Sequence, residues 1–154
     1  MTRAASADVV VYVCTNCVPP GGRIARQWDQ DGAHVLVREV PCSGKTDLQY
    51  LLGALAGGAR GICVVACPRG ECQLAEGNYR AEVRIGTLRR LLAEIGIEPE
   101  RAELVHCSPH GPFDRFEQLV HDAVGRICTL GASPVREKGT GPIRQKGPVP
   151  FSRR

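Results

Sequence analysis

The sequence has few aromatic residues and no long apolar run. Its 154 residues include three Phe, three Tyr and one Trp, and 43% are hydrophobic, a composition that suits one globular core of ordinary size. No run approaches the roughly 20 apolar residues that a membrane-spanning helix needs. The segment Met1–Asp8 lacks the apolar core of a signal peptide. We therefore expect a cytoplasmic protein without a membrane span.

Motifs of several enzyme classes are missing as well. We find no Ser/His/Asp set, no paired carboxylates and no substrate-binding glycine loop. Gly44-Lys45-Thr46 resembles the end of a phosphate-binding P-loop, but that motif needs a glycine at position 39, where Glu39 stands. Nucleotide binding through a P-loop is therefore excluded, and whether the chain is an enzyme stays open.

Positive charge is concentrated at the C-terminal end. The formal net charge is +4, yet residues 133–154 alone carry +5, so residues 1–132 carry −1. Residues 133–154 also hold four Pro and three Gly and lack helical periodicity, so we expect a disordered or extended basic tail after one domain, residues 1–132. The tail either stays solvated or orders on an acidic partner. Nucleic-acid binding is not expected, because no base-reading motif accompanies the charges.

Strand-like and helical patterns alternate along residues 1–132. Short apolar runs predict strands over residues 8–13, 34–40, 61–66 and 101–106. Helical spacing of apolar residues predicts helices near Ile24 and Trp28 and over residues 48–56, 79–95 and about 113–130, the third of these capped by Asn78. This alternation indicates an α/β fold with a small parallel sheet, a flavodoxin-like or Rossmann-like layer sandwich.

Cysteine is abundant, and its positions are the most informative feature of the chain. Five of the eight cysteines fall just past the ends of three of the expected strands: Cys14, Cys17, Cys42, Cys67 and Cys72. The carboxyl ends of parallel strands collect ligand-binding groups at one edge of the sheet, so we expect one shared thiolate pocket. Because cytosolic thiols are kept reduced, metal binding or redox chemistry is favoured over a disulfide scaffold.

The cysteine spacing leaves the type of site open. Cys14-x-x-Cys17 at a strand-to-helix turn suits a redox dithiol as well as a pair of metal ligands. In the loop from Cys67 to Cys72, Gly70 leaves backbone N–H groups free to bond sulfur. Four thiolates complete a 2Fe-2S, a 4Fe-4S or a zinc site, so one of five is left over. We favour a metal or iron-sulfur site over a thiol-disulfide oxidoreductase or a zinc-stabilised interaction module.

The other three cysteines are expected to have different roles. Cys63 lies in the middle of a strand and Cys128 lies on the apolar side of the last helix, so both are interpreted as small buried hydrophobic residues. Cys107 stands next to His106 and close to His110, which makes it an alternative ligand.

The motifs also resemble one known family. The segments that carry the likeness are Cys14-Thr-Asn-Cys17, Cys42-Ser-Gly44, Ala66-Cys-Pro-Arg-Gly-Glu-Cys72, Gly77-Asn-Tyr79 and Gly96-Ile-Glu-Pro-Glu-Arg101. Together they resemble the delta subunit of methyl-viologen-reducing hydrogenase over about residues 8–131. Ser108-Pro-His-Gly111 departs from the family pattern, as does the basic tail, which leaves the neighbouring subunits open.

The resemblance implies a role in electron transfer rather than in substrate turnover. Members of that family are small iron-sulfur subunits with a 2Fe-2S cluster. They pass electrons from a hydrogenase, formate dehydrogenase or similar module to a flavoprotein like the A-type subunit of heterodisulfide reductase. The resemblance thus implies a hetero-oligomer of anaerobic metabolism. It implies Cys14, Cys17, Cys42, Cys67 and Cys72 as cluster ligands, with Gly70 and Asn78 shaping the surrounding loop and Tyr79 packed against it.

Overall fold

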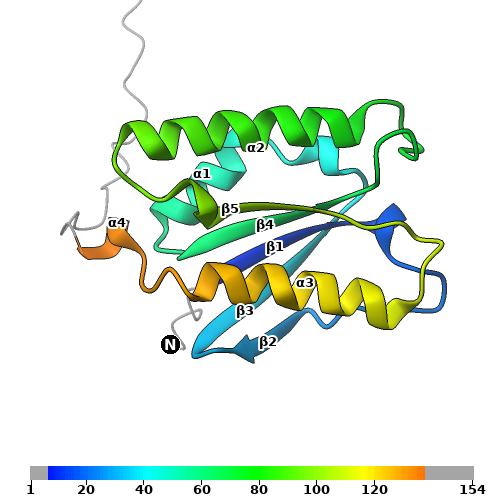
Figure 1. Ribbon diagram of the computed structural model, residues 1–154, viewed down its shortest axis with the longest axis horizontal. Coiled ribbons are helices and arrows are strands. Elements are labelled where there is room, and N and C mark those ends of the chain that lie inside the picture. Colours follow the sequence, from blue (N-terminus) through cyan, green and yellow to red (C-terminus); the bar gives the residue numbers. More distant parts are fainter. Residues whose placement is uncertain (1–6, 138–154) are drawn as a thin grey trace, which may run out of the picture.

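The structure, a computed structural model, describes residues 7–137 (Figure 1). Its sheet has five strands in the order β2-β3-β1-β4-β5. Four of them are parallel: β1 (Val9–Cys14), β3 (Ala33–Val40), β4 (Gly61–Ala66) and β5 (Ala102–His106). Their order, with β1 between the second and third parallel strands, is that of flavodoxin-like folds, so the expected α/β class is confirmed.

Helices cover both faces of the sheet. Helices α1 (Leu48–Ala56) and α2 (Gly77–Glu94) lie on one face, and α3 (Phe113–Cys128) lies on the other (Figure 1). These three helices match the predicted ones to within a few residues. A short helix, α4 (Pro134–Glu137), follows within the segment predicted as a tail. The remaining tail residues, 138–154, lie outside the described part of the chain.

The two faces of β1 build two separate cores. Val9, Val11 and Val13 pack into the core beneath α3, whereas Val10 and Tyr12 pack into the core beneath α1 and α2. All six residues of β1 and all six of β4 are buried. Strands covered on both faces are expected to be continuously apolar, which explains why these two strands were recognisable from the sequence.

The helix predicted near Ile24 and Trp28 is wrong. Residues Gln27–Gln30 instead form β2, which pairs antiparallel with β3 at the edge of the sheet. Asp31 and Gly32 join the two strands with positive φ angles of 49° and 73°, as a two-residue Asp-Gly hairpin turn requires. Ile24 and Trp28 still pack against the core beneath α3. Their apolar spacing therefore reflects burial of β2 and the segment before it rather than of a helix.

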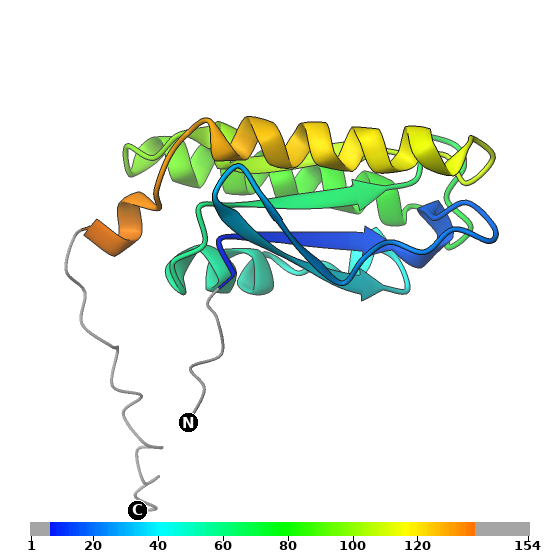
Figure 2. The same cartoon turned by 90° about the horizontal axis from the view of Figure 1, so that it is seen from below.

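The parallel strands all end at the same edge of the sheet. The arrowheads of β1, β3 and β4 point the same way in Figure 2, and β5 is parallel to β4. A 3₁₀ turn, η1 (Thr15–Cys17), follows β1, and a second, η2 (Ser43–Lys45), comes shortly after β3. A loop over residues 67–76 leads from β4 to the N-terminus of α2. Among residues 7–137, no helix combines the length and apolarity that crossing a membrane requires.

A buried arginine joins three segments at the opposite end of the sheet, where β4 and β5 begin. Arg101 is 2% exposed and donates hydrogen bonds to the carbonyl oxygens of Arg60 (2.8 Å), Leu130 (2.9 Å) and Gly131 (3.4 Å). Its Nε also donates to the Glu98 carboxylate at 2.8 Å. One guanidinium thus joins the start of β5 to the C-terminal end of α3 and to the segment before β4.

We predict that Arg101→Met lowers the free energy of unfolding by about 2–4 kcal/mol, because it leaves buried carbonyl groups without donors. Urea denaturation followed by circular dichroism measures the change. Arg90→Met, at an exposed position of α2, serves as the control and should leave stability almost unchanged. Equal stability of the two variants would contradict this role of Arg101.

Candidate metal centre

Three of the five predicted thiols meet at the ends of β1 and β4. The Sγ atoms of Cys14, Cys17 and Cys67 all lie within 4.8 Å of one another, and those of Cys17 and Cys67 are 3.3 Å apart. Cys14 ends β1 and Cys67 directly follows β4, its parallel neighbour. The single turn η1 then brings Cys17 back over the strand ends. All three side chains are buried, at 0–2% exposure.

The other two predicted thiols form a second group beside the first. Cys42 and Cys72 converge on Gly77, the first residue of α2. A Cβ atom at Gly77 would overlap the Cys42 Sγ and lie 3.3 Å from the Cys72 Sγ. Burial raises the pKa of Cys42, and negative charge on Cys72 and on Cys14 raises it further. The five sulfurs therefore lie in one region, arranged as three and two.

Backbone amides and a neighbouring thiol stabilise Cys14 as a thiolate. A hydrogen bond from the Cys17 thiol, opposed by burial and supported by the N–H groups of Asn16 and Ser43, lowers the pKa of Cys14 to about 5. The thiolate is the form that binds metals. The amide of Ser43 comes from η2, so the turn after β3 contributes to a sulfur carried by β1.

The N-terminus of α2 is directed at Cys72. Burial alone would raise the pKa of Cys72, but the N–H groups of Asn78, Leu74 and Gly77 outweigh it and lower that pKa. Two of these amides belong to the first turn of α2, whose N–H groups have no partner inside the helix and favour negative charge. Cys72 is only partly buried, so this thiolate is the one nearest to solvent.

The remaining two thiols hold their protons. The pKa of Cys17 is raised by its hydrogen bond to Cys14 and by burial. The pKa of Cys67 is raised to about 11, mainly by burial. Crowded thiolates in a buried space repel one another, so full ionisation of this group requires a cation among the sulfurs. The donor set therefore fits a thiolate-bound metal or iron-sulfur group.

Two glycines allow the turn η2 to touch the start of α2. A Cβ atom at Gly44 would lie 2.8 Å from the Gly77 Cα, closer than real contacts allow. Both positions therefore require glycine for steric reasons. At this contact the N–H of Gly44 bonds Cys42, and the N–H groups of Gly77 and Asn78 bond Cys72. The contact accounts for the glycines in two of the sequence motifs.

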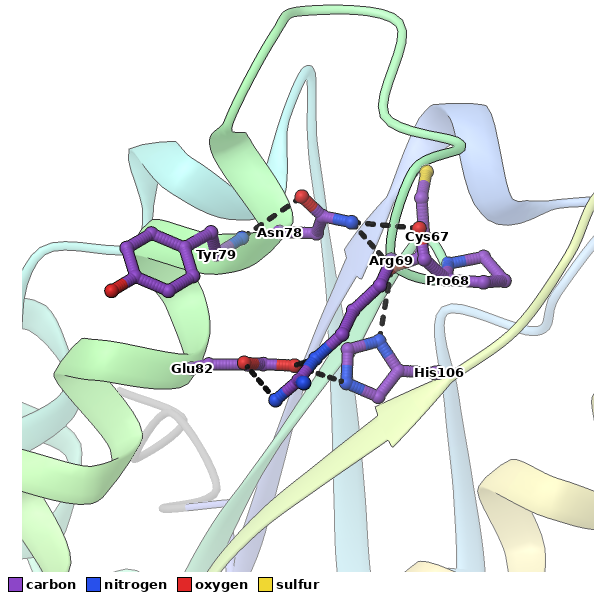
Figure 3. A network of polar contacts seen from close by, with 7 residues as sticks. All are labelled: Cys67, Pro68, Arg69, Asn78, Tyr79, Glu82 and His106. Atoms are coloured by element: carbon purple, nitrogen blue, oxygen red, sulfur yellow. Dashed lines mark hydrogen bonds and ion pairs between the residues drawn. The ribbon is translucent and has the colours of Figure 1, made fainter.

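Asn78 joins α2 to the loop that carries Cys67 (Figure 3). Its Nδ2 donates to the carbonyl oxygens of Cys67 (3.2 Å) and Pro68 (2.7 Å). Its predicted role as a helix cap is wrong, because α2 begins one residue earlier, at Gly77, after Glu76. Asn78 thus shapes the loop, as the resemblance implied. Tyr79, expected to pack there, is 60% exposed.

A polar chain supports the same loop from the other side. The His106 Nδ1 lies 2.9 Å from the Cys67 carbonyl oxygen, and the His106 Nε2 lies 3.1 Å from the Glu82 carboxylate. Arg69 donates twice to Glu82, at 2.9 Å each. Figure 3 shows the Cys67 sulfur pointing away from His106. The chain therefore fixes the backbone of the loop and leaves the sulfur facing the other thiols. Sequence reasoning missed Glu82, which no linear motif marks.

The three remaining cysteines lie outside the group of three. Cys63 is fully buried in β4, where burial raises its pKa, as expected of an apolar core residue. Cys128 is partly buried on α3, and its Sγ donates to the Gln30 carbonyl oxygen at 3.8 Å. Cys107 is buried beside the α3 core, and burial raises its pKa to about 11.

Comparisons with known proteins place the chain in one family. The family model described as methyl-viologen-reducing hydrogenase, delta subunit, matches residues 9–131. The D-type iron-sulfur subunit of the F420-non-reducing hydrogenase of Archaeoglobus profundus is 47% identical over 70 residues, which are 46% of this chain and 51% of that protein. The corresponding vhu iron-sulfur subunit of Methanopyrus kandleri is 37% identical over 97 residues, 63% of this chain and 73% of the relative.

A third relative is much longer. The A-type subunit of the ferredoxin:CoB-CoM heterodisulfide reductase of Methanosarcina mazei is 30% identical over 98 residues, 64% of this chain but only 12% of that protein. The match thus spans about half of the Archaeoglobus relative and a small part of the Methanosarcina one. Because the family model covers most of the sequence, the chain belongs to the methyl-viologen-reducing hydrogenase delta-subunit family.

Proposed function

We propose that this chain is an electron-transfer subunit that carries a 2Fe-2S cluster and catalyses no reaction of its own. The observation that carries the proposal is the meeting of five cysteines from three strand ends beside amide N–H groups. The cluster, when bound, supplies one-electron chemistry at its irons. The names of relatives as iron-sulfur subunits support this assignment.

The geometry divides the proposed ligands Cys14, Cys17, Cys42, Cys67 and Cys72 into two classes. Cys14, Cys17 and Cys67 are the three that lie together and are buried. Since four thiolates complete the site, one of Cys42 and Cys72 is proposed as the fourth ligand. The other remains beside it at Gly77.

The surrounding residues hold the sulfurs and set their charge balance. Burial of Cys14, Cys17 and Cys67 excludes water from their side of the site. Amide N–H groups of η2 and of the first turn of α2 stabilise negative charge on sulfur. Hydrogen bonds to ligand sulfur and solvent exposure are the levers that tune a cluster potential.

The names of the relatives support a position between two larger redox modules. Some are hydrogenase subunits, and another is a heterodisulfide reductase polypeptide of the A type that contains a segment similar to this chain. In that relative, a segment similar to this chain and the rest of the A-type subunit belong to one polypeptide. This supports contact between this chain and an A-type subunit where they are separate proteins. We propose a cytoplasmic hetero-oligomer in which a hydrogenase, formate dehydrogenase or similar module delivers electrons for a flavoprotein like the A-type subunit of heterodisulfide reductase.

Two other functions each have one observation in their favour. The lowered pKa of Cys14 beside Cys17 also suits a thiol-disulfide oxidoreductase. Three sulfurs within 4.8 Å also suit a zinc-stabilised interaction module. The dithiol function does not account for Cys42, Cys72 and the amides directed at them. The zinc function does not account for the naming of relatives as iron-sulfur subunits, which is why we favour the cluster.

Metal and sulfide analysis of protein purified without oxygen tests the proposal. We expect a coloured protein with about two irons and two acid-labile sulfides per chain, whose visible absorption bleaches with dithionite. Zinc in a colourless protein would assign the structural module instead. A metal-free, colourless protein after anaerobic reconstitution would leave the dithiol function.

Single cysteine substitutions test the ligand assignment. We expect Cys14→Ser and Cys67→Ser to lose most of the iron, because each removes one of the three buried thiols. Of Cys42→Ser and Cys72→Ser, one should retain iron. Cys128→Ser, remote from the site, is the control and should match the wild type. Full iron content in Cys14→Ser would refute the assignment.

Substitution of Gly77 tests whether close packing forms the site. Gly77→Ala should reduce iron content strongly, because the added Cβ overlaps the Cys42 Sγ. Gly86→Ala is the matched control, since Gly86 lies on the same helix with open space around it. It should keep its iron and gain up to about 1 kcal/mol in stability. If both variants hold the same amount of iron, the steric argument is wrong.

A further inference from the structure

One side of the thiol group is closer to solvent than the other. Cys14, Cys17, Cys42 and Cys67 are 0–5% exposed, whereas Cys72 is only partly buried. A hollow of about 510 Å³ has Cys42 and Gly77 in its wall, and Gly77 also adjoins the Cys72 sulfur. A protein bound in this hollow would therefore lie close to the sulfurs of Cys42 and Cys72.

The walls of the hollow carry positive charge. Lys45, Arg80 and Arg84 line it together with a single carboxylate, Asp47. Arg84 is held in place by hydrogen bonds to the carbonyl oxygens of Gly44 and Thr46. Neither Lys45 nor Arg80 forms an ion pair with another of the residues described here. The local excess of positive charge contrasts with the net charge of −1 on residues 1–132.

Exposed apolar side chains border the same hollow. Tyr50 and Leu74 line it, although they are 69% and 57% exposed. Tyr79, 60% exposed, does not line the hollow itself but directly precedes Arg80, which does. Large apolar side chains that gather on a surface inside a polar rim are typical of protein interaction sites. We call this surface, made by Lys45, Tyr50, Leu74, Tyr79, Arg80 and Arg84, the basic face.

The basic face continues into a second groove. Lys45 and Tyr50 also line a groove of about 870 Å³ that runs along α1 and the outer side of β3, past Leu36 and Val40. The two hollows therefore form one continuous surface, wider than a small ligand needs. This extent and the exposed tyrosines favour a protein occupant over a free anion.

We infer that the basic face docks the acidic surface of a redox partner protein, at the point where that partner's own cofactor comes nearest to its surface. The inference rests on the proposed function, since it names the surface through which the subunit exchanges electrons. Charge complementarity defines the partner: carboxylates around an apolar centre would pair with Lys45 and Arg80 and cover Leu74 and Tyr79.

Charged small oxidants test the basic face without a partner. The dithionite-reduced protein is mixed in a stopped-flow instrument with ferricyanide, an anion, or with hexaamminecobalt(III), a cation. Arg80→Glu should slow the reaction with ferricyanide and speed that with hexaamminecobalt(III). At low salt, the rate with ferricyanide divided by the rate with hexaamminecobalt(III) should fall on the order of tenfold relative to the wild type. This ratio should recover as the salt concentration rises. A structural defect or a changed potential would move both rates in the same direction.

Arg90→Glu is the matched control. Arg90 is exposed on α2, ten residues and about 15 Å beyond Arg80 along the helix. The inference is overturned if the rate ratio of Arg80→Glu stays within twofold of that of Arg90→Glu. That failure differs from a failure of the proposed function, in which the wild type holds no iron and reduces neither oxidant.

Docking itself is measured with the partner proposed above, a flavoprotein like the A-type subunit of heterodisulfide reductase. Biolayer interferometry at increasing KCl should show binding that weakens with salt. It should also show an affinity at least tenfold lower for Arg80→Glu than for Arg90→Glu. Equal affinities of the two variants would overturn the inference, as would self-association of the wild type through this face in size-exclusion chromatography.

Discussion

Repulsion between thiolates in a small buried space is the constraint on which the site depends. Cys14, Cys17 and Cys67 come together because β1 and β4 are parallel neighbours whose ends coincide. Without a cation, only Cys14 of these three has a lowered pKa, and the others keep their protons. The fold thus brings the sulfurs together and supplies N–H groups, but it leaves the main electrostatic compensation to a bound metal group.

Close backbone packing extends this arrangement to the other two cysteines. Gly44 and Gly77 let η2 and the first turn of α2 approach within a distance that any side chain would prevent. Amides from both segments are then directed at sulfur, and Asn78 fixes the loop that carries Cys67. Cys72 lies on the solvent side, and cationic side chains line the hollow beside Gly77. Buried thiols and an exposed edge together suit a centre that exchanges electrons with another protein.

Much of this could be predicted from the sequence, for identifiable reasons. Strands buried on both faces are continuously apolar, so β1 and β4 and the cysteines after them were recognisable. The β2 hairpin was missed because Ile24 and Trp28 imitate helical spacing, although Asp31-Gly32 is a hairpin signal. The division of the cysteines into three and two could not be predicted, because it depends on Gly77 meeting Cys42, a contact between segments 35 residues apart in the chain.

We propose that one iron-sulfur centre lies where these cysteines meet. Anomalous scattering from crystals grown without oxygen, measured on both sides of the iron absorption edge, tests it most directly. We expect iron density among the sulfurs of Cys14, Cys17 and Cys67, with Cys42 or Cys72 as the fourth ligand. Iron at another place in the fold, or a signal at the zinc edge and none at the iron edge, would contradict it.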